Sequence, residues 1–446
     1  MRRLSIVGAG YVGLVTGVCF AEKGHDVVCV DVDECKVDLI NKGISPIHEA
    51  GLAELLRENA GNRLKATTNL SKAVLDTDIT FLAVGTPFNG TEIDLTYIRN
   101  ASTQTGNALR AKESYHCVVV KSTVVPGTTD TVLLPLLEGA SGKSAGKDFG
   151  IGNNPEFLTE GTAVVDFMSP DRIVLGGIDR KALAELQSLY RDFEGVDVIC
   201  TNNKTAEMIK YASNALLATM ISFSNEMGNL CSTLGGIDVT DVLRGVHSSR
   251  YLSPALPDGT RVRSPINSFL WPGCGFGGSC LPKDVKALIA HGEQSGQSMR
   301  LLDSVISINA EQHKQVIGRL NKHFTTLKGV RVAVLGLSFR PDTDDMRESP
   351  AIPIVSILLE QGAIVRAYDP AAIPKARSLF KEKPLTLSEN LADTIQDVQA
   401  ILLITSWDEF QILPDLLADV APQPIVIDCR RMLDKSQIAK YEGIGL

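Results

Sequence analysis

The chain alternates between two hydrophobic patterns up to about residue 200. Short runs rich in Val and Ile are separated by amphipathic stretches, and these runs are LSIVGAG, VVCVDVD, ITFLAVGTP, HCVVVKSTV, FGIGNNP and RIVLGG. Such alternation is typical of βαβ units, in which helices connect the strands of a parallel sheet. We therefore expect an α/β domain at the start of the chain.

A helical pattern replaces this alternation in the middle of the chain. The segment from about 203 to 235 keeps the helix period, with no Pro and with only Gly228 before its last residue, Gly235. A second helical region is expected over 282–325. The stretch between the two is rich in Pro, Gly and Ser, which predicts an irregular loop. Its length makes it a place to look for function.

The α/β pattern returns at Gly329, and the two ends of the chain match each other in type and order. Near the start the order is IVGAG…EKGHDVVCVDVD, and near the end it is VLGLS…EQGAIVRAYDP. We predict an α/β protein with two Rossmann-like, doubly wound parallel-sheet domains, over 1–200 and 326–446. A central helical domain with a long helix, over 201–325, should join them.

Composition and charge narrow the function classes. The 446 residues are 44% hydrophobic and 22% charged, which suits full hydrophobic cores. The net charge of −8 is spread without long blocks, so we expect neither nucleic acid nor an anionic membrane as partner. No apolar run reaches the roughly 18 residues of a membrane span, and no signal-peptide pattern is visible, so a cytoplasmic location is expected. The nine cysteines form no CxxC pair, and we expect no metal site.

The first glycine motif predicts a dinucleotide site. Gly8-Ala9-Gly10-Tyr11-Val12-Gly13 follows one expected strand and opens an expected helix, and Asp31 ends the next strand. The glycines permit a tight turn, close approach of a pyrophosphate and close helix packing. Asp31 should accept hydrogen bonds from ribose hydroxyls and repel a 2′-phosphate, which favours NAD over NADP. Lys36 either faces the adenosine end or is a solvated helix lysine.

The second repeat departs from this motif. Its turn reads Gly336-Leu337-Ser338-Phe339-Arg340, so bulky side chains stand where glycines let backbone and phosphate meet. A second dinucleotide is not expected there. The sheet still has a crevice at its switch point, which suits a different ligand such as a nucleotide.

Cys280 differs from the other cysteines in its setting. It follows the glycines of Gly275-Phe276-Gly277-Gly278, and Pro282 suits the first turn of a helix. At a helix N-terminus, with Lys283 near, the thiolate is favoured, and Asp284 lies one turn along on the same side. The alternative, a buried cysteine beside a helix cap, suits the other eight better, and we expect most of these to be reduced core thiols.

A nucleophilic cysteine beside an NAD site suggests oxidation through a thiohemiacetal and then a thioester, which water must hydrolyse. A carboxylate near the sulfur would handle that water, and Asp284 and Glu156 are the candidates. Glu156 lies in the NNPEF loop after an expected strand. By itself it also fits a solvated loop acid.

Further polar residues stand where they would reach the same crevice. Lys210 and Asn214 are four apart on the long helix, so their side chains are neighbours and suit a developing oxyanion, or they form only a polar stripe. Lys121-Ser122-Thr123 ends another strand and would present a hydroxyl there, although a structural threonine is equally consistent.

Taken together, these motifs resemble the UDP-glucose/GDP-mannose dehydrogenase family along nearly the whole chain. They are GAGYVGL, VGTP, KSTVVPGT, NPEFLTEGTAVVDFMSPDRIVLGG, KTAEMIKYASNALLAT, GFGGSCLPKD and GLSFRPDTDDMRESP followed by AYDP. The resemblance implies an NAD-dependent four-electron oxidation of the C6 alcohol of UDP-glucose to UDP-glucuronate. GDP-mannose or another UDP-hexose is the alternative substrate, and a single-hydride alcohol dehydrogenase is the more remote one. It also implies a homodimer or larger homo-oligomer built on the central helix.

The resemblance assigns roles residue by residue. Its catalytic residues are Cys280, Lys210, Asn214, Asp284, Glu156 and Thr123. Its NAD contacts, besides Gly8, Gly10, Tyr11, Val12 and Gly13, are Asp31, Lys36, Thr86, Ser122, Thr123, Glu160, Lys283 and Arg347. Its substrate contacts are Glu156, Phe157, Leu158, Lys210, Asn214, Arg263, Phe276, Gly277, Phe339 and Arg340.

One departure from the family concerns an arginine. In the family, the loop before the cysteine is usually shorter and sends an arginine into the neighbouring subunit's sugar site. Here Arg250, Arg261 and Arg263 all compete for that role, and Arg263 fits best by its distance in sequence from Cys280. The identity of the sugar depends on this choice.

Overall fold

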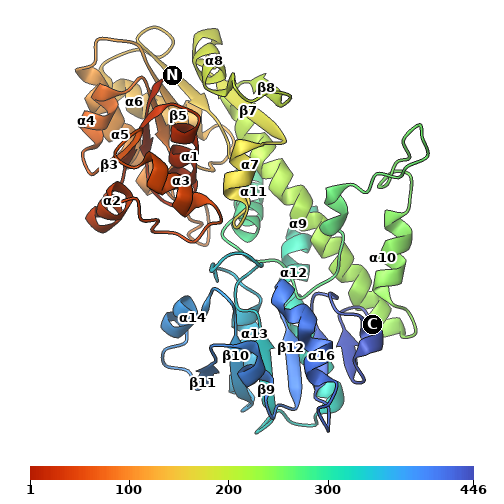
Figure 1. Cartoon of the computed structure of the whole chain (residues 1–446). Coiled ribbons are helices and arrows are strands. Elements are labelled where there is room, and N and C mark those ends of the chain that lie inside the picture. The colour runs from red at the N-terminus through yellow and green to blue at the C-terminus, as the bar shows by residue number, and fades with distance from the viewer. The chain divides into compact units, whose positions relative to one another are not determined.

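The computed structural model describes residues 1–446 and divides them into two compact units, Met1–Ser213 and Asn214–Leu446 (Figure 1). Each unit contains a Rossmann-like sheet covered by helices on both faces. This confirms the predicted fold class. The three-part domain division stays a prediction.

The first unit is built on an eight-stranded sheet with the order β3-β2-β1-β4-β5-β6-β7-β8. All neighbours pair in parallel except β6 and β7, which are antiparallel. The central strands are buried along their whole length, as in β5, because helices cover both faces. The strands are β1 (Arg3–Val7), β2 (Asp26–Val30), β3 (Leu64–Thr67), β4 (Ile79–Leu82), β5 (His116–Val120), β6 (Phe149–Asn153), β7 (Arg172–Gly177) and β8 (Asp197–Thr201).

The helices of the first unit form two layers. Residues of α1, α3, α7 and α8 pack in the core on one face of the sheet, and α4, α5 and α6 pack in the core on the other. The helices are α1 (Tyr11–Glu22), α2 (Glu34–Asn41), α3 (Leu52–Asn59), α4 (Leu70–Asp76), α5 (Thr96–Arg110), α6 (Leu134–Ser141), α7 (Ala163–Met168) and α8 (Arg180–Gln187). A π-helical turn (Thr129–Leu133) leads into α6.

The second unit has a six-stranded, all-parallel sheet with the order β11-β10-β9-β12-β13-β14. This is the order of the first six strands of the other sheet. The strands are β9 (Arg331–Leu335), β10 (Ile364–Tyr368), β11 (Leu385–Leu387), β12 (Ala400–Leu403), β13 (Ile425–Asp428) and β14 (Tyr441–Gly443).

A long helix, α9, runs from Asn203 to Leu234, in agreement with the helix predicted over 203–235. The helical region predicted over 282–325 is two helices, since a turn around Gly296 divides it. The helices after α9 are α10 (Val239–His247), α11 (Leu281–Gln294), α12 (Arg300–His323), α13 (Ala351–Glu360), α14 (Ile373–Leu379), α15 (Leu391–Ile395) and α16 (Leu413–Leu417).

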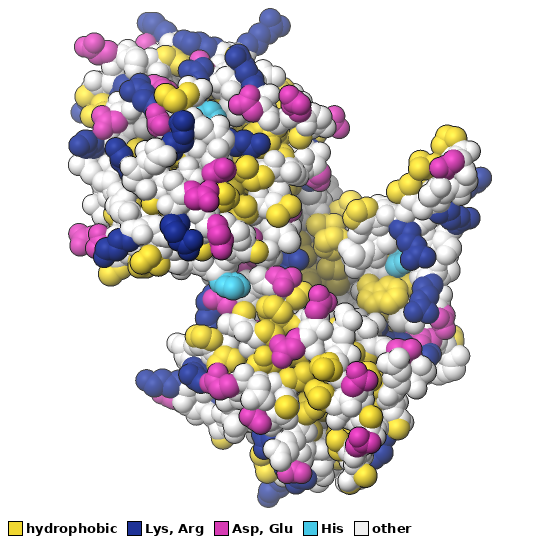
Figure 2. Space-filling view, viewed as in Figure 1, with side chains coloured by type: hydrophobic (Ala, Val, Ile, Leu, Met, Phe, Trp, Pro, Cys, Tyr) yellow, Lys and Arg dark blue, Asp and Glu magenta, His cyan; other side chains and the backbone are white.

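The segment between α10 and α11 is irregular, as its Pro, Gly and Ser content predicts. It holds only a short 3-10 turn (Pro265–Ser268) and an isolated bridge between Ala255 and Arg261. None of the helices combines the length and apolar character needed to cross a bilayer. Figure 2 shows acidic and basic side chains mixed over the face in view, without an extended field of one sign.

Candidate functional site

The turn between β1 and α1 uses each of its glycines differently. Gly8 has a φ of +100°, and a Cβ there would lie 2.7 Å from the carbonyl oxygen of Ala83. A Cβ on Gly13 would lie 1.8 Å from the oxygen of Gly8, whereas one on Gly10 would meet nothing within 4 Å. Gly8 and Gly13 therefore make the tight turn, and Gly10 leaves open space at the N-terminus of α1. This is the space that a dinucleotide's pyrophosphate needs.

Asp31 follows β2 and is half-exposed. Its carboxylate accepts the backbone N–H groups of Ala9, at 2.8 Å, and Asp33, at 3.0 Å. These bonds fix the carboxylate beside the glycine turn, where the ribose of a bound dinucleotide lies in this fold. Lys36 stands in the first turn of α2, which Asp33 caps. This position is consistent both with a lysine that faces the adenosine end of a dinucleotide and with a solvated helix lysine.

Three hydroxyl residues follow β4 and β5 at the same edge of the sheet as the glycine turn. Thr86 donates to the carbonyl oxygen of Thr123 at 2.7 Å. Ser122 donates to the carbonyl oxygen of Val84 at 2.7 Å. The two loops are thereby tied together directly beside Ala83, the residue under Gly8. The predicted residues Thr86, Ser122 and Thr123 thus form one group next to the turn.

Glu156 and Lys210 form a buried ion pair. Their side-chain oxygen and nitrogen lie 3.0 Å apart, and each side chain is only 5% exposed. Glu156 also accepts the backbone N–H of Leu158 at 2.7 Å. Burial acts to raise the pKa of Glu156, but Lys210, the Leu158 N–H and Lys121 outweigh it and hold the pKa below its ordinary value. Glu156 is therefore an ionised carboxylate, not the solvated loop acid of the alternative interpretation.

A buried polar network lies behind this pair. The ammonium of Lys121 donates to the amide oxygen of Asn154 at 2.9 Å, and the hydroxyl of Tyr190 donates to the same oxygen at 2.5 Å. Burial lowers the pKa of Lys121 to about 8. Asn154 and Tyr190 were not identified as site residues from the sequence. Asn154 could have been identified, because it stands in the NNPEF motif directly before Pro155 and Glu156.

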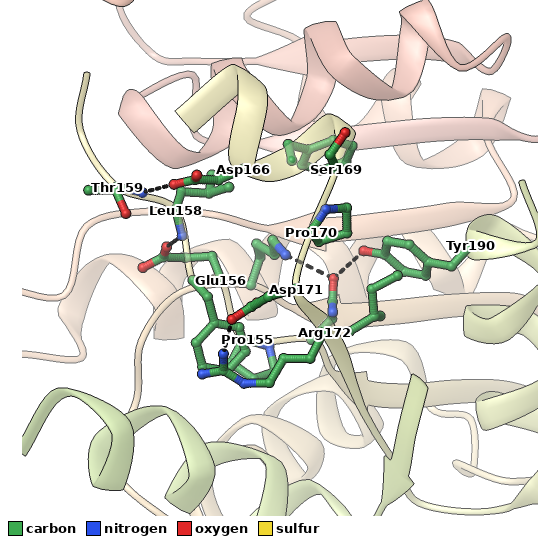
Figure 3. A pocket seen from close by; sticks show the side chains of 15 residues that line it. Pro155, Glu156, Leu158, Thr159, Asp166, Ser169, Pro170, Asp171, Arg172 and Tyr190 are labelled. Carbon is green, nitrogen blue, oxygen red and sulfur yellow. Dashed lines mark hydrogen bonds and ion pairs between the residues drawn. The ribbon is translucent and has the colours of Figure 1, made fainter. Parts of the chain in front are cut away.

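These residues line a hollow of about 280 Å³ in the first unit (Figure 3). The guanidinium of Arg172 lies 4.0 Å from the ring centre of Phe157, and the ammonium of Lys210 lies 5.4 Å from it. The predicted substrate residues Phe157 and Leu158 are thus on the wall of a cavity with cations beside an aromatic ring. Its lining is Lys121, Asn154, Pro155, Glu156, Phe157, Leu158, Thr159, Asp166, Phe167, Ser169, Pro170, Asp171, Arg172, Ile173 and Tyr190.

Glu49 holds the end of this loop, and nothing in the sequence patterns singled it out. It is 7% exposed and accepts the backbone N–H groups of Gly161, at 2.8 Å, and Ala163, at 2.7 Å. The hydroxyl of Tyr11 donates to the same carboxylate. Tyr11 belongs to the glycine motif, so Glu49 couples that motif to the loop that carries the half-buried Glu160.

In the second unit, Cys280 immediately precedes α11, with Pro282 in the helix's first turn. The backbone N–H of Asp284 donates to the carbonyl oxygen of Cys280 at 2.8 Å. Asp284 is 1% exposed, and it accepts from the amide of Asn214 at 2.7 Å and from the ammonium of Lys283 at 2.6 Å. Four of the predicted residues therefore meet at the N-terminus of one helix. Lys283, expected near the sulfur, is bonded to Asp284.

The glycines before Cys280 pack against the loop that follows β9. A Cβ on Gly277 would lie 2.2 Å from the carbonyl oxygen of Glu348, and one on Gly278 would lie 2.7 Å from the ring of Phe339. The backbone N–H of Phe276 donates to Asn309 at 2.8 Å. The predicted substrate residues Phe276, Gly277 and Phe339 thus belong to one packed group.

The turn after β9 is closed where the turn after β1 is open. Ser338 is fully buried; its hydroxyl donates to Asp369, and its carbonyl oxygen accepts from Thr405. Phe339 and Arg340 are half-buried. Arg347 pairs with Asp345 at 2.6 Å and is largely exposed. A Cβ on Gly336 would lie 2.4 Å from the side chain of Thr405, and no second glycine stands at the place of Gly10.

The three competing loop arginines, Arg250, Arg261 and Arg263, are all exposed. Arg250 stacks near the ring of Tyr251, and Arg261 donates to the carbonyl oxygen of Ser248. Their surroundings do not select one of them, and Arg263 stays a prediction.

Comparison with known protein families gives matches to three parts of the chain. Family models match residues 2–194 (UDP-glucose/GDP-mannose dehydrogenase family, NAD binding domain), 204–311 (central domain of that family) and 333–435 (UDP binding domain of that family). The glycine turn, Asp31 and the N-terminus of α1 fit NAD, which is the cofactor.

Individual relatives agree with these matches. UDP-glucose 6-dehydrogenase AglM of Haloferax volcanii is 43% identical, with 99% of both chains covered. GDP-mannose 6-dehydrogenase of Pseudomonas aeruginosa is 38% identical, with 99% of both chains covered. A solved UDP-glucose dehydrogenase from Pyrobaculum islandicum has a TM-score of 0.90 at 36% identity, covering 100% of this chain and 98% of that one. The chain belongs to the UDP-glucose/GDP-mannose dehydrogenase family and is an NAD-dependent nucleotide-sugar 6-dehydrogenase.

Proposed function

We propose that this enzyme oxidises the C6 alcohol of UDP-glucose to a carboxylate, giving UDP-glucuronate by way of a thioester on Cys280. The observation that carries this proposal is Cys280 at the N-terminus of α11, with Asp284 held one turn below it by Asn214 and Lys283. A single-hydride alcohol dehydrogenase forms no covalent intermediate and would not need a cysteine in this setting.

Each residue has a stated part in this reaction. NAD, when bound, supplies the acceptor for hydride from C6. After the first oxidation, the Cys280 thiolate adds to the aldehyde carbon, and the second oxidation leaves a thioester whose hydrolysis frees the thiol and the acid. Lys210 and Asn214 supply an ammonium and an amide, one helical turn apart, for the developing oxyanions. Glu156 is ionised and can therefore act as the general base that accepts the proton of the attacking water.

The remaining site residues are assigned to binding. We propose that Asp31, Lys36, Thr86, Ser122, Thr123, Glu160, Lys283 and Arg347 contact NAD. Substrate contacts are assigned to Phe157, Leu158, Arg263, Phe276, Gly277, Phe339 and Arg340. The UDP end of the substrate belongs, in this proposal, to the second unit, whose matching family model is the UDP binding domain.

We also propose a homodimer formed through α9. Leu216, Phe223 and Leu230 recur at every seventh position of this helix and are 53%, 45% and 50% exposed. An apolar stripe of this kind on a helix is typical of a helix–helix interface. The cytoplasmic location stays a prediction.

The test of the reaction is its stoichiometry. With purified full-length protein and limiting UDP-glucose, we expect two NADH for each sugar and an acid as the product. One NADH and a free aldehyde would remove the thioester proposal. Parallel assays with GDP-mannose, UDP-galactose and N-acetylated UDP-sugars test the substrate assignment separately. If any of these turned over faster than UDP-glucose, it would take the place of UDP-glucose as the proposed substrate.

The test of the nucleophile is Cys280→Ser. A serine hydroxyl at neutral pH is a far weaker nucleophile than a thiolate, so we expect net acid formation to fall by about 1,000-fold or more while both ligands still bind. Cys200→Ser, at an exposed cysteine on β8, is the matched control and should keep wild-type rates. Wild-type rates in Cys280→Ser would show that another group is the nucleophile.

A further inference from the structure

Two buried cysteines of the second unit, far apart in the sequence, lie side by side. Cys274 stands in the glycine loop before Cys280, and Cys429 directly follows β13. The backbone N–H of Cys274 donates to the carbonyl oxygen of Cys429 at 3.1 Å. Cys274 is 2% exposed and Cys429 is fully buried.

Neighbouring contacts show that the two segments, and not just the two residues, are adjacent. A Cβ on Gly273 would lie 3.2 Å from the carbonyl oxygen of Cys429. On the other side, the guanidinium of Arg430 donates to the carbonyl oxygen of Gly275 at 3.1 Å. Two cysteines can be bridged when their Cα atoms lie within roughly 7 Å, and backbones joined in this way meet that condition.

The hydrogen bonds and charges around the pair make its two sulfurs unequal. The thiol of Cys274 and the guanidinium of Arg430 share one acceptor, the carbonyl oxygen of Ile404, at 3.7 Å and 2.6 Å. A hydrogen bond from the Cys429 thiol, together with Arg430, lowers the pKa of Cys274 to about 7 against the effect of burial. Burial and the same neighbour raise the pKa of Cys429. This asymmetry, one activated thiol beside one protonated thiol, is typical of a dithiol that forms disulfides.

We propose that Cys274 and Cys429 are a reversible dithiol–disulfide pair that joins the glycine loop to the end of β13 when a peroxide is present. In the first step the Cys274 thiolate attacks hydrogen peroxide, the O–O bond breaks, and a sulfenic acid and hydroxide result. In the second step the Cys429 sulfur displaces the sulfenic oxygen, which leaves as water with the thiol proton. The two sulfurs together lose two electrons to the peroxide.

A small oxidant fits the burial of the pair, because it needs only a brief opening of the loop to reach Cys274. The glycines at 273, 275, 277 and 278 give this segment more backbone freedom than a helix or strand would. The crosslink would join positions far apart in the sequence, so it should stabilise the second unit by restricting its unfolded chain. None of this depends on the proposed sugar reaction.

The experiment uses full-length Cys280→Ser protein, so that the half-exposed Cys280 thiol does not react. The reduced protein is treated with hydrogen peroxide, its remaining thiols are alkylated, and it is digested without reductant. We expect a peptide that links Cys274 to Cys429, that is two hydrogens lighter than its parts, and that dithiothreitol splits. Adding Cys274→Ser or Cys429→Ser should each abolish the link.

Heat denaturation of the folded protein provides a second measurement of the disulfide link. Both tryptophans, Trp271 and Trp407, lie in the second unit, so their fluorescence follows that unit alone. Oxidation should raise its melting temperature, and Cys429→Ser should remove the rise. The proposal is overturned if Cys274 and Cys429 are recovered as free thiols after the exposed Cys35 and Cys200 have been oxidised. It is equally overturned if the link forms only in denaturant.

Discussion

The two Rossmann-like sheets share a strand order but use the same two positions in opposite ways. In both, a glycine with positive φ follows the first strand: Gly8 at +100° and Gly336 at +90°. In both, an aspartate directly follows the second strand: Asp31 after β2 and Asp369 after β10. Asp31 is half-exposed and accepts two backbone N–H groups, so it retains capacity for a ligand. Asp369 is 1% exposed and fully engaged within its own unit.

The contacts of Asp369 show what the second unit does with its acid. Its carboxylate accepts from the backbone of Leu337 and Ser338, the hydroxyl of Ser338 and the indole N–H of Trp407. It also accepts from the two residues at the start of the following turn, Ala371 and Ala372. Here the acid supports the turn from within. The fold thus preserves a glycine and an acid in both places, while the ligand depends on what surrounds them.

The connection between the first strand and the next helix is short in the first unit and long in the second. In the first unit α1 starts at Tyr11, shortly after Gly8, so the N-terminus of the helix is available to a pyrophosphate. In the second unit α13 starts only at Ala351, and residues 336–350 form a longer connection between strand and helix. Phe339 of this loop packs on the glycine segment that leads to Cys280.

The largest difference between the two acids should appear in stability. Asp369→Ala leaves several buried donors without an acceptor, so we expect the free energy of unfolding of the second unit to fall by about 4 kcal/mol. Asp31→Ala should change stability by less than about 1 kcal/mol, because solvent replaces its bonds. Urea denaturation followed by tryptophan fluorescence measures the first effect, and circular dichroism measures both. Equal losses in the two variants would show that the acids have the same structural role.

The next effect concerns the open position in the first turn. Gly10 has extended backbone angles, and a side chain there meets nothing, so Gly10→Val should fold normally. It should weaken NAD binding by about 100-fold, roughly 3 kcal/mol, because the added groups occupy the pyrophosphate's place. Calorimetry with NAD measures this, and Gly139→Ala, in α6 with open space around it, is the control. If the affinity of Gly10→Val for NAD were unchanged, the pyrophosphate of NAD would not bind at this turn.

A smaller difference between the units should appear with pH. His116 on β5 is buried, bonded to Thr80 and to the carbonyl oxygen of Thr77, and burial lowers its pKa to about 3. Its folded pKa lies below the ordinary value near 6.5, so its stabilising contribution is present above that pH and is lost as the pH falls. Between pH 6.5 and 4.5 the contribution of His116 to the stability of the first unit should fall by about 2–3 kcal/mol.

Hydrogen exchange at the amides of β4 and β5 measures this loss in the first unit. The histidines of the second unit are all at least partly exposed, so its core strands should respond less. His116→Gln should remove this contribution and leave those of His25 and Glu207, whereas His48→Gln, at an exposed position, should leave the pH dependence unchanged. An unchanged dependence in His116→Gln would assign it to other groups.

The smallest effect concerns cofactor choice. Asp31→Ala should narrow the preference for NAD over NADP by about 10-fold, because it removes a like charge from the position of the 2′-phosphate. Ratios of kcat/KM for the two cofactors measure it. If the wild type used both cofactors equally, Asp31 would not face the ribose.

The sequence predicted the parts of this picture that depend on local patterns. The glycine turn, α9, the helix start at Cys280 and the closeness of Asp284 all follow from spacing along one or two elements. β3, β8, β11 and β14, the edge strands of the two sheets, were not predicted. β3, β11 and β14 lack continuous apolar runs, and β8 is largely exposed.

What could not be predicted depends on contacts between distant segments. Glu49 and Tyr190 reach the loop of Glu156 only once the chain is folded, and neither stands in a motif with a chemical meaning of its own. The bond between Lys283 and Asp284 required side-chain positions that helix spacing leaves open. The pairing of Cys274 with Cys429 likewise comes from the packing of a loop against a strand end.

We propose a division of labour in which the first unit binds the dinucleotide and the second binds the nucleotide of the sugar. Hydrogen exchange on the full-length protein, with NAD or with UDP alone, tests it directly. We expect NAD to slow exchange in peptides covering 8–13 and 31–36, and UDP to slow exchange in peptides covering 336–340 and 275–278. Protection of 8–13 by UDP, or of 336–340 by NAD, would contradict it.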